Sequence, residues 1–165
     1  MIRLKIKDYI PKRSDKFFFD NNIWMYLYCP IGQYNENIVN VYSDFFGRAL
    51  DVQSTIYVSS LIISEFYNSF IRLDFNIWKK TQSLDYKKDF RPTEQFQKTN
   101  QLVLRSIESR ILGVSKRINE DFSTLSIENI IERVGLLDYN DSYYVELSKM
   151  YGLKIVTNDK DFDRI

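Results

Sequence analysis

The last quarter of the chain places acidic side chains at a helix start and directly after a short strand. Asp141 begins a helix that is predicted to end at Gly152. A β-branched strand over residues 154–157 then leads into Asp159 and Asp161. Carboxylates brought together at one rim of a sheet are suited to bind a divalent metal ion.

Two acids further upstream fit the same plan. Asp20 ends the apolar run 17–19, and Glu65 lies on a helix predicted to follow a strand over residues 55–58. In open α/β sheets, ligand sites form beyond the carboxyl ends of the strands. We therefore expect these two acids to meet those of the last quarter, although they lie far apart in the sequence. The expected set is Asp20, Glu65, Asp141 and Asp159.

The residue types that are missing narrow the chemistry. The chain has no histidine and one cysteine, Cys29, which we expect to be a small buried apolar residue. An intrachain disulfide and a cysteine-rich zinc site are excluded, and the commonest general base is absent. Carboxylate oxygens are ligands that Mg²⁺ and Mn²⁺ prefer, so these ions are the expected metals. The positive end of the helix dipole is expected to keep Asp141 ionised, an effect of about 0.3–1 kcal/mol.

Composition indicates one globular domain. The 165 residues are 44% hydrophobic and 27% charged, and the formal net charge of +1 does not by itself point to nucleic acid. No apolar run approaches the roughly 20 residues needed to span a bilayer. The basic N-terminus lacks the apolar segment and cleavage site of a signal peptide, so we expect a cytoplasmic protein without membrane contact.

Strands alternate with helices along the chain, which predicts a parallel sheet layered between helices. Residues 1–15 are expected to form an N-terminal arm or an edge strand, and residues 16–165 the folded domain. The stretch 76–91 is polar and aromatic and predicts a loop-rich or clamp region. Further helices are predicted over residues 23–28, 39–49, 61–73, 102–118 and 127–134, the last stopped at Gly135.

Three motifs resemble the PIN-domain ribonucleases, most of all the VapC-type toxins of bacterial toxin–antitoxin pairs. These motifs are FFFDNN at 17–22, SSLIISEF at 59–66 and DSYYVELSKMYGLKIVTNDKDF at 141–162. The resemblance covers residues 16–162 and implies a three-layer α/β/α PIN-like domain. Family members generally have a further strand beyond the position of Ile165, so a mainly parallel sheet of four or five strands is expected. Asn21 departs from the small residue usual after the first acid.

The resemblance also implies roles for individual residues. Asp20, Glu65, Asp141 and Asp159 would bind Mg²⁺ or Mn²⁺, with Asp161 as a further candidate ligand. Asn22 and Thr157 match an asparagine and a hydroxyl residue of the family pattern, and both are suited to orient carboxylates or water through hydrogen bonds. The implied partners are RNA, a small VapB-like antitoxin and a second copy in a homodimer.

The expected reaction is cleavage of single-stranded RNA by a metal-activated water. Two alternatives share the same acids: a catalytically silent PIN-like module that binds RNA or protein, and a metal-dependent nuclease that acts on DNA. Salt-sensitive contacts to the RNA backbone are expected from basic residues, and base stacking from aromatic ones. The basic candidates are Lys79, Lys80, Lys87, Lys88, Arg91, Arg105, Arg110, Lys116 and Arg117; the stacking candidates are Tyr67, Trp78, Tyr86 and Phe90.

Overall fold

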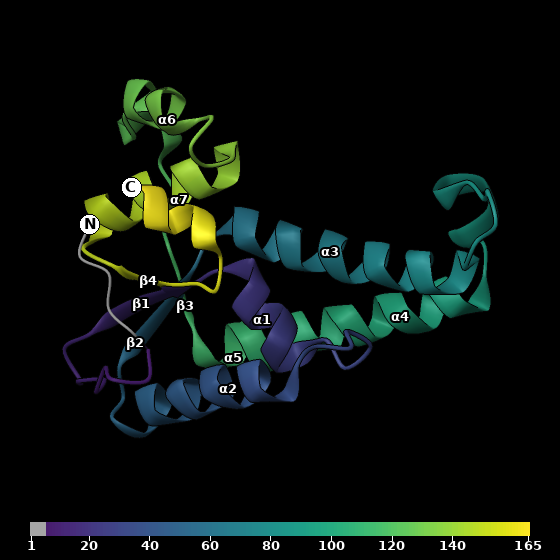
Figure 1. Ribbon diagram of the computed structural model, residues 1–165, viewed down its shortest axis with the longest axis horizontal. Coiled ribbons are helices and arrows are strands. Elements are labelled where there is room, and N and C mark those ends of the chain that lie inside the picture. The colour runs from purple at the N-terminus through teal and green to yellow at the C-terminus, as the bar shows by residue number, and fades with distance from the viewer. Residues whose placement is uncertain (1–5) are drawn as a thin grey trace.

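A parallel sheet lies at the centre of the computed structural model, which describes residues 6–165 (Figure 1). Within these residues, four strands pair in the order β3-β2-β1-β4, all parallel. This confirms the predicted α/β class with a parallel sheet. The strands are β1 (Lys16–Phe19), β2 (Thr55–Val58), β3 (Lys116–Arg117) and β4 (Lys154–Val156).

The side chains of β1 define the layers on either side of the sheet. Phe17 packs edge-on against Phe45 of α2 (Glu36–Asp51), with ring centroids 5.3 Å apart. Phe18 points the other way and lies 5.0 Å from Tyr144 of α7 (Tyr139–Tyr151). Successive side chains of a strand point to opposite faces, so α2 and α7 cover the two faces of the sheet. Figure 1 shows these helices below and above it.

Two long helices project from this body as an arm, which we define as residues 60–105 (Figure 1). They are α3 (Ser60–Lys79) and α4 (Glu94–Arg105), and a π-helix over Tyr86–Phe90 lies between them. The prediction of a loop-rich region over 76–91 is therefore wrong at both ends of that stretch. A cluster of five rings extends the hydrophobic core of the domain to the tip of the arm, and this packing favours helical structure there. The cluster contains Phe75, Trp78, Tyr86, Phe90 and Phe96.

The long helix predicted over 102–118 ends earlier than expected. It continues α4 through a π-helix (Ser106–Ile111) and α5 (Leu112–Val114), and then the chain enters β3. Ile118 N–H donates to the Val58 carbonyl at 2.9 Å, so pairing with β2 outweighs the helical pattern. Lys116 and Arg117 therefore lie on a strand and not on the basic helical face that the sequence suggested.

The remaining helices follow the sequence more closely. Cys29 is buried, as predicted. Gly135 lies just beyond α6 (Ile127–Arg133) and has a φ of +111°, a conformation that glycine tolerates best. No helix within residues 6–165 is long and apolar enough to cross a membrane. The remaining helical elements are α1 (Asn21–Tyr28), α6 (Ile127–Arg133) and the 3₁₀ turns at Phe122–Thr124 and Lys160–Arg164.

The N-terminal arm or edge strand predicted over 1–15 falls partly on residues 1–5, which lie outside the described residues. Residues 6–15 form turns and irregular structure, without a strand. Asp15, buried at the end of this segment, forms an ion pair with Lys154 of β4 and accepts a hydrogen bond from the Tyr9 hydroxyl at 2.8 Å. The segment is thereby fastened to the end of the sheet where β1 and β4 begin.

Candidate active site

Asp20 lies directly after β1, at the carboxyl end of the strand, which is the place that the sequence pattern predicted for it. Its N–H donates to the Val156 carbonyl at 3.0 Å, which joins β1 to β4, and its side chain caps α1. One carboxylate oxygen accepts from the Asn22 amide at 2.5 Å and from the Thr157 hydroxyl at 2.7 Å. The other oxygen accepts from the Asn21 N–H at 2.6 Å. Asn22 and Thr157 therefore hold the Asp20 carboxylate in one orientation through these hydrogen bonds.

The turn after β4 separates the roles of the two acids in the TNDKDF motif. Thr157 Oγ1 accepts from the Asp159 N–H at 2.9 Å, which holds Asp159 beside the residues around Asp20. The Asp159 carboxylate accepts from the Asp161 N–H at 2.8 Å and caps the following 3₁₀ turn. The carboxylate of Asp161 pairs with Arg164 at 3.5 Å. Of these two acids, Asp159 is therefore the better candidate for a metal ligand.

Glu65 is held from α7 by two residues that the sequence analysis missed. The Asn140 amide donates to one carboxylate oxygen at 2.6 Å, and the Tyr144 hydroxyl donates to the other. Asn140 and Tyr144 are four residues apart and share one face of α7, so both can reach the same carboxylate. That spacing on either side of Asp141 was the available signal in the sequence.

Asp141 lies inside the first turn of α7 and does not cap the helix. The cap is Asp138, whose carboxylate accepts from the Asp141 N–H at 2.8 Å. Burial raises the pKa of Asp141 to about 8, and the negative charges of Asp20, Asp138, Asp159 and Glu65 act in the same direction. The expectation that the helix dipole keeps Asp141 ionised is wrong. Raising a pKa by a single unit corresponds to about 1.4 kcal/mol against the ionised form, which is already more than the ~0.3–1 kcal/mol by which the dipole favours it.

The four predicted acids act on one another through their charges. Burial raises the pKa of Asp20 to about 6, with Glu65 and Asp159 contributing in the same direction against the hydrogen bonds from Thr157 and Asn21. All three other members also act on Asp141, so four separate segments of the chain bring carboxylates to one region. We call Asp20, Glu65, Asp141 and Asp159 the acidic cluster.

The donor chemistry of the acidic cluster fits a hard divalent cation, because every available ligand atom is a carboxylate oxygen. Crowded carboxylates repel one another unless a cation compensates them. The side-chain positions do not already form a cage, since no three acidic, cysteine or histidine side chains within residues 6–165 are placed to hold a metal ion.

Comparison with known proteins agrees with this architecture. The chain matches the PIN domain family over residues 17–165. It belongs to the PIN domain family. PIN domains are generally nucleases, and such nucleases typically use divalent metals. None of the curated proteins compared with the chain matches it.

The aromatic residues suggested for base stacking in this PIN domain differ in their availability. Phe90 is fully buried at the tip of the arm, so its proposed stacking role is wrong. Tyr67 donates its hydroxyl to Asn100 at 2.8 Å between α3 and α4. Trp78 and Tyr86 are half-buried at the tip, where each keeps part of its ring exposed.

Proposed function

We propose that this PIN domain is a metal-dependent endonuclease that cuts single-stranded RNA and serves as the toxin of a toxin–antitoxin pair. The observation that carries the proposal is the acidic cluster, in which four separate segments contribute one carboxylate each. Burial and the neighbouring carboxylates raise the pKa values of Asp20 and Asp141, and the donors to Asp20 and Glu65 include neutral side-chain amides. Such an arrangement is unfavourable without a cation, and it lies at the carboxyl ends of β1 and β4 in a family of nucleases.

Asp20, Glu65, Asp141 and Asp159 would hold Mg²⁺ or Mn²⁺. The bound cation supplies a water of lowered pKa and polarises the phosphoryl group. Asn22 and Thr157 keep the Asp20 carboxylate oriented, and Asn140 and Tyr144 do the same for Glu65. Without a cation, the Asp141 carboxyl keeps a proton at neutral pH, because its pKa is about 8.

The partners follow from the resemblance to VapC-type toxins. We propose that a small VapB-like antitoxin covers the acidic cluster and keeps the toxin inactive. A homodimer is proposed on the same ground. The choice of RNA over DNA also comes from the resemblance, since attack by an activated water does not require a ribose 2′-hydroxyl.

A cleavage panel tests the proposal. Single-stranded RNA and DNA are incubated with the parent, Asp20→Asn, Asp141→Asn and the control Asp51→Asn, an exposed acid at the end of α2. We expect the parent and the control to cut RNA with Mg²⁺ or Mn²⁺ and not with a chelator. Both cluster variants should lose about 100-fold or more of this activity, the scale for removing a positioned catalytic group.

The same panel separates the alternatives. If both cluster variants cut as fast as the parent, the proposed mechanism is wrong. Preferential cutting of DNA would identify a DNA nuclease. RNA binding without metal-dependent cutting would identify a silent binding module.

A further inference from the structure

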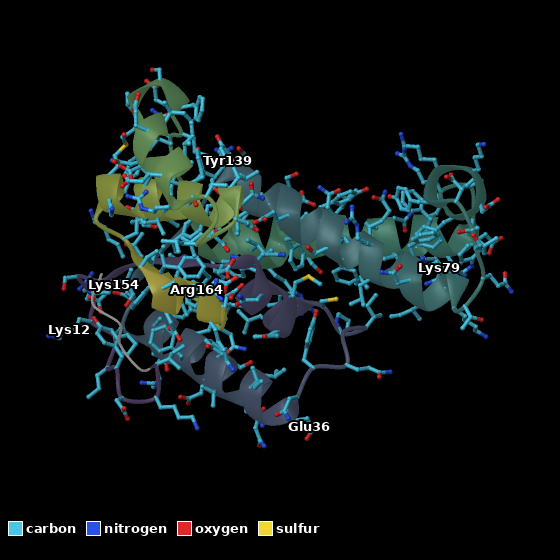
Figure 2. The ribbon with its side chains drawn as sticks, turned by 45° about the horizontal axis from the view of Figure 1, so that its top comes forward. Lys12, Glu36, Lys79, Tyr139, Lys154 and Arg164 are labelled. Carbon is cyan, nitrogen blue, oxygen red and sulfur yellow. The ribbon has the colours of Figure 1, made fainter. Side chains whose placement is uncertain are left out.

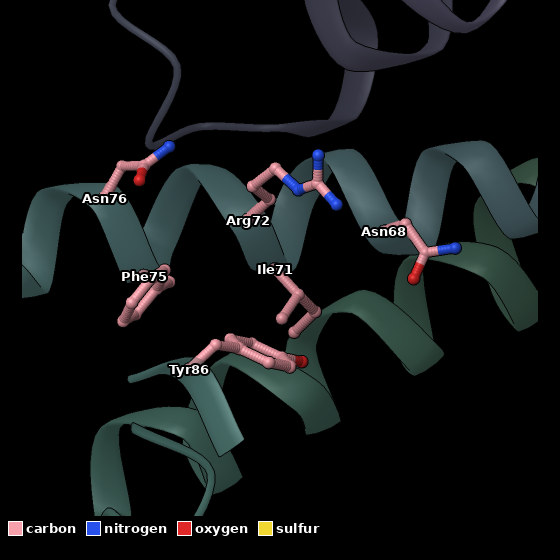
Figure 3. Close-up of a pocket in the computed structure, with 6 residues that line it drawn as sticks. All are labelled: Asn68, Ile71, Arg72, Phe75, Asn76 and Tyr86. Carbon is pink, nitrogen blue, oxygen red and sulfur yellow. The ribbon is translucent and has the colours of Figure 1, made fainter. Parts of the chain in front are cut away.

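The arm carries a pocket of about 280 Å³ on α3, away from the acidic cluster (Figure 3). It is slightly smaller than the roughly 300–1,000 Å³ of pockets that hold drug-sized ligands, so it suits a smaller group. Figure 3 shows Ile71 and Phe75 pointing from α3 toward the ring of Tyr86. None of its lining residues is acidic; they are Asn68, Ile71, Arg72, Phe75, Asn76 and Tyr86.

The polar lining residues form one row along α3. Asn68, Arg72 and Asn76 follow at intervals of four residues, which places them on the same face of the helix, and all three are exposed. Arg72 has no hydrogen bond or ion pair with any residue of the described range 6–165. Two amide groups and a guanidinium therefore line the pocket with hydrogen-bonding capacity that can be used by a ligand.

Tyr86 provides a firmly held aromatic surface. Phe75 lies edge-on to it at 5.5 Å, and Phe90 and Phe96 lie 6.0 Å and 6.4 Å away. Burial raises the pKa of the Tyr86 phenol, and Arg72 and Arg91 act in the opposite direction, so both guanidinium groups lie near it. A ring fixed by three others loses little freedom when a ligand stacks on it.

We infer that this pocket binds one nucleotide of a single-stranded RNA, with its base on Tyr86 and its phosphate near Arg72. Unstacked bases are recognised by aromatic stacking and by hydrogen bonds to their edges, which amides such as Asn68 and Asn76 can make. Arg72 follows Glu65 by seven residues, which is about 10 Å along a helix. The bound nucleotide therefore lies beside the path that the RNA takes to the acidic cluster. The inference rests on the proposed ribonuclease function and adds a contact outside the reacting bond.

The test measures binding without cleavage. A fluorescently labelled single-stranded RNA of mixed sequence is titrated with the parent and variants in chelator, at several salt concentrations. Tyr86→Leu should weaken binding about fivefold or more, whereas Tyr86→Phe, which keeps the ring, should bind like the parent. Arg72→Gln should reduce the slope of log affinity against log salt by about 0.7, the value for one phosphate contact on a single strand.

Lys12→Gln is the matched control, because it removes one positive charge at the end of the molecule opposite Lys79 and the tip (Figure 2). It should leave the salt slope unchanged. Arg72 is exposed, so its variant tests the pocket even if Tyr86→Leu disturbs the tip. Parent-like affinity and slope in both Arg72→Gln and Tyr86→Leu would overturn the inference, as would an equal loss of slope in Lys12→Gln. If RNA is bound through Arg72 but never cut, the pocket stands and the proposed nuclease activity fails.

Discussion

Asp141 and Asp20 hold protons at pH values where an exposed aspartate is ionised. Their pKa values of about 8 and about 6 have the same main cause, which is burial, and neighbouring carboxylates add to it. The folded protein therefore binds protons that the unfolded chain releases. Between the ordinary aspartate pKa and the raised value, folding becomes less favourable as the pH increases.

The first prediction concerns this pH dependence in the absence of metal. With chelator present, thermal stability should fall as the pH rises from about 4 to about 8 and level off above that range. Asp141→Asn should show a smaller fall and should be more stable than the parent at pH 8, because it cannot ionise. Thermal unfolding at pH 5 and pH 8 measures both effects.

Asp51→Asn serves as the control, since this exposed acid should leave the pH dependence as it is in the parent. A parent protein equally stable at both pH values would contradict the prediction. Mg²⁺ or Mn²⁺ should raise the unfolding temperature more at pH 8 than at pH 5, because protons compete with the cation for the same carboxylates.

The second prediction separates two adjacent tyrosines. Tyr144 donates to Glu65 of the acidic cluster, and Tyr143 donates to Glu120 at 2.9 Å outside it. Either change to phenylalanine should lower the free energy of unfolding by about 1 kcal/mol, the usual net value of one hydrogen bond. Only Tyr144→Phe should also slow RNA cleavage, by about 10- to 100-fold, the range for partners that orient metal ligands.

Urea unfolding and initial cleavage rates provide the two measurements. Equal cleavage by the two variants would show that Tyr144 does not position Glu65.

At the scale of single residues, the sequence indicated the acids because they follow apolar strand segments. It did not indicate Asn140 or Tyr144 as partners of Glu65, because that contact depends on how α3 and α7 approach each other in space. Asp138 has a local role as the cap of α7, which the sequence pattern assigned to Asp141.

The arm depends on a buried polar contact between its two helices. Asp74 of α3 is 3% exposed, and Gln95 of α4 donates to its carboxylate at 2.9 Å and 3.2 Å. A buried carboxylate is costly when it lacks hydrogen bonds. Gln95, although itself exposed, therefore stabilises the pairing of α3 with α4.

The third prediction follows from that contact. Gln95→Ala should lower the free energy of unfolding by about 1–3 kcal/mol, because Asp74 stays buried with its donor removed. Gln97→Ala, also exposed and on α4, should change it by less than about 0.5 kcal/mol. Urea unfolding of both variants measures the difference, and equal effects would exclude a special role for Gln95.

The sequence predicted elements well where the pattern was local. The strands β1 and β2 are short β-prone runs bounded by polar residues, and α2 and α6 show regular apolar spacing. It failed for β3, which has two exposed basic residues and exists because β2 offers a pairing edge. It also failed at the tip of the arm, where rings from α3, the π-helix and α4 pack together and fix the structure of a polar stretch.

At the scale of the whole molecule, the acids at the two ends of the sheet differ in the direction in which the fold moves their pKa values. Burial alone would raise the pKa of Asp15, but hydrogen bonds from Lys154, Tyr9 and the Lys12 N–H bring it below its usual value. Asp20, at the other end of the same strand, has a raised pKa. One end of β1 therefore supports the fold through its carboxylate, and the other carries charge that the fold alone does not compensate.

The fourth prediction tests the supporting end. Asp15→Asn should lower the free energy of unfolding at pH 7 by about 1.5–3 kcal/mol, the range for hydrogen bonds to a charged group. A lowered pKa contributes stability above the unfolded value of about 3.8 that is lost as the pH falls, so the deficit should shrink below pH 4. Asp8→Asn, an exposed acid of the same segment, is the control. A deficit that is constant from pH 7 to pH 3 would contradict the role of the charge.

The three buried phenylalanines of β1 have a consequence for strand alignment. Shifting a strand by one residue normally exchanges an apolar face for a polar one, and this penalty fixes its alignment. In β1 such a slip would still place phenylalanine at two of the three buried positions, with Lys16 or Asp20 at the third. A further penalty comes from Asp15 and Asp20, which would be pulled away from their donors. The carboxylates that flank β1, more than its apolar centre, therefore fix the register of this strand.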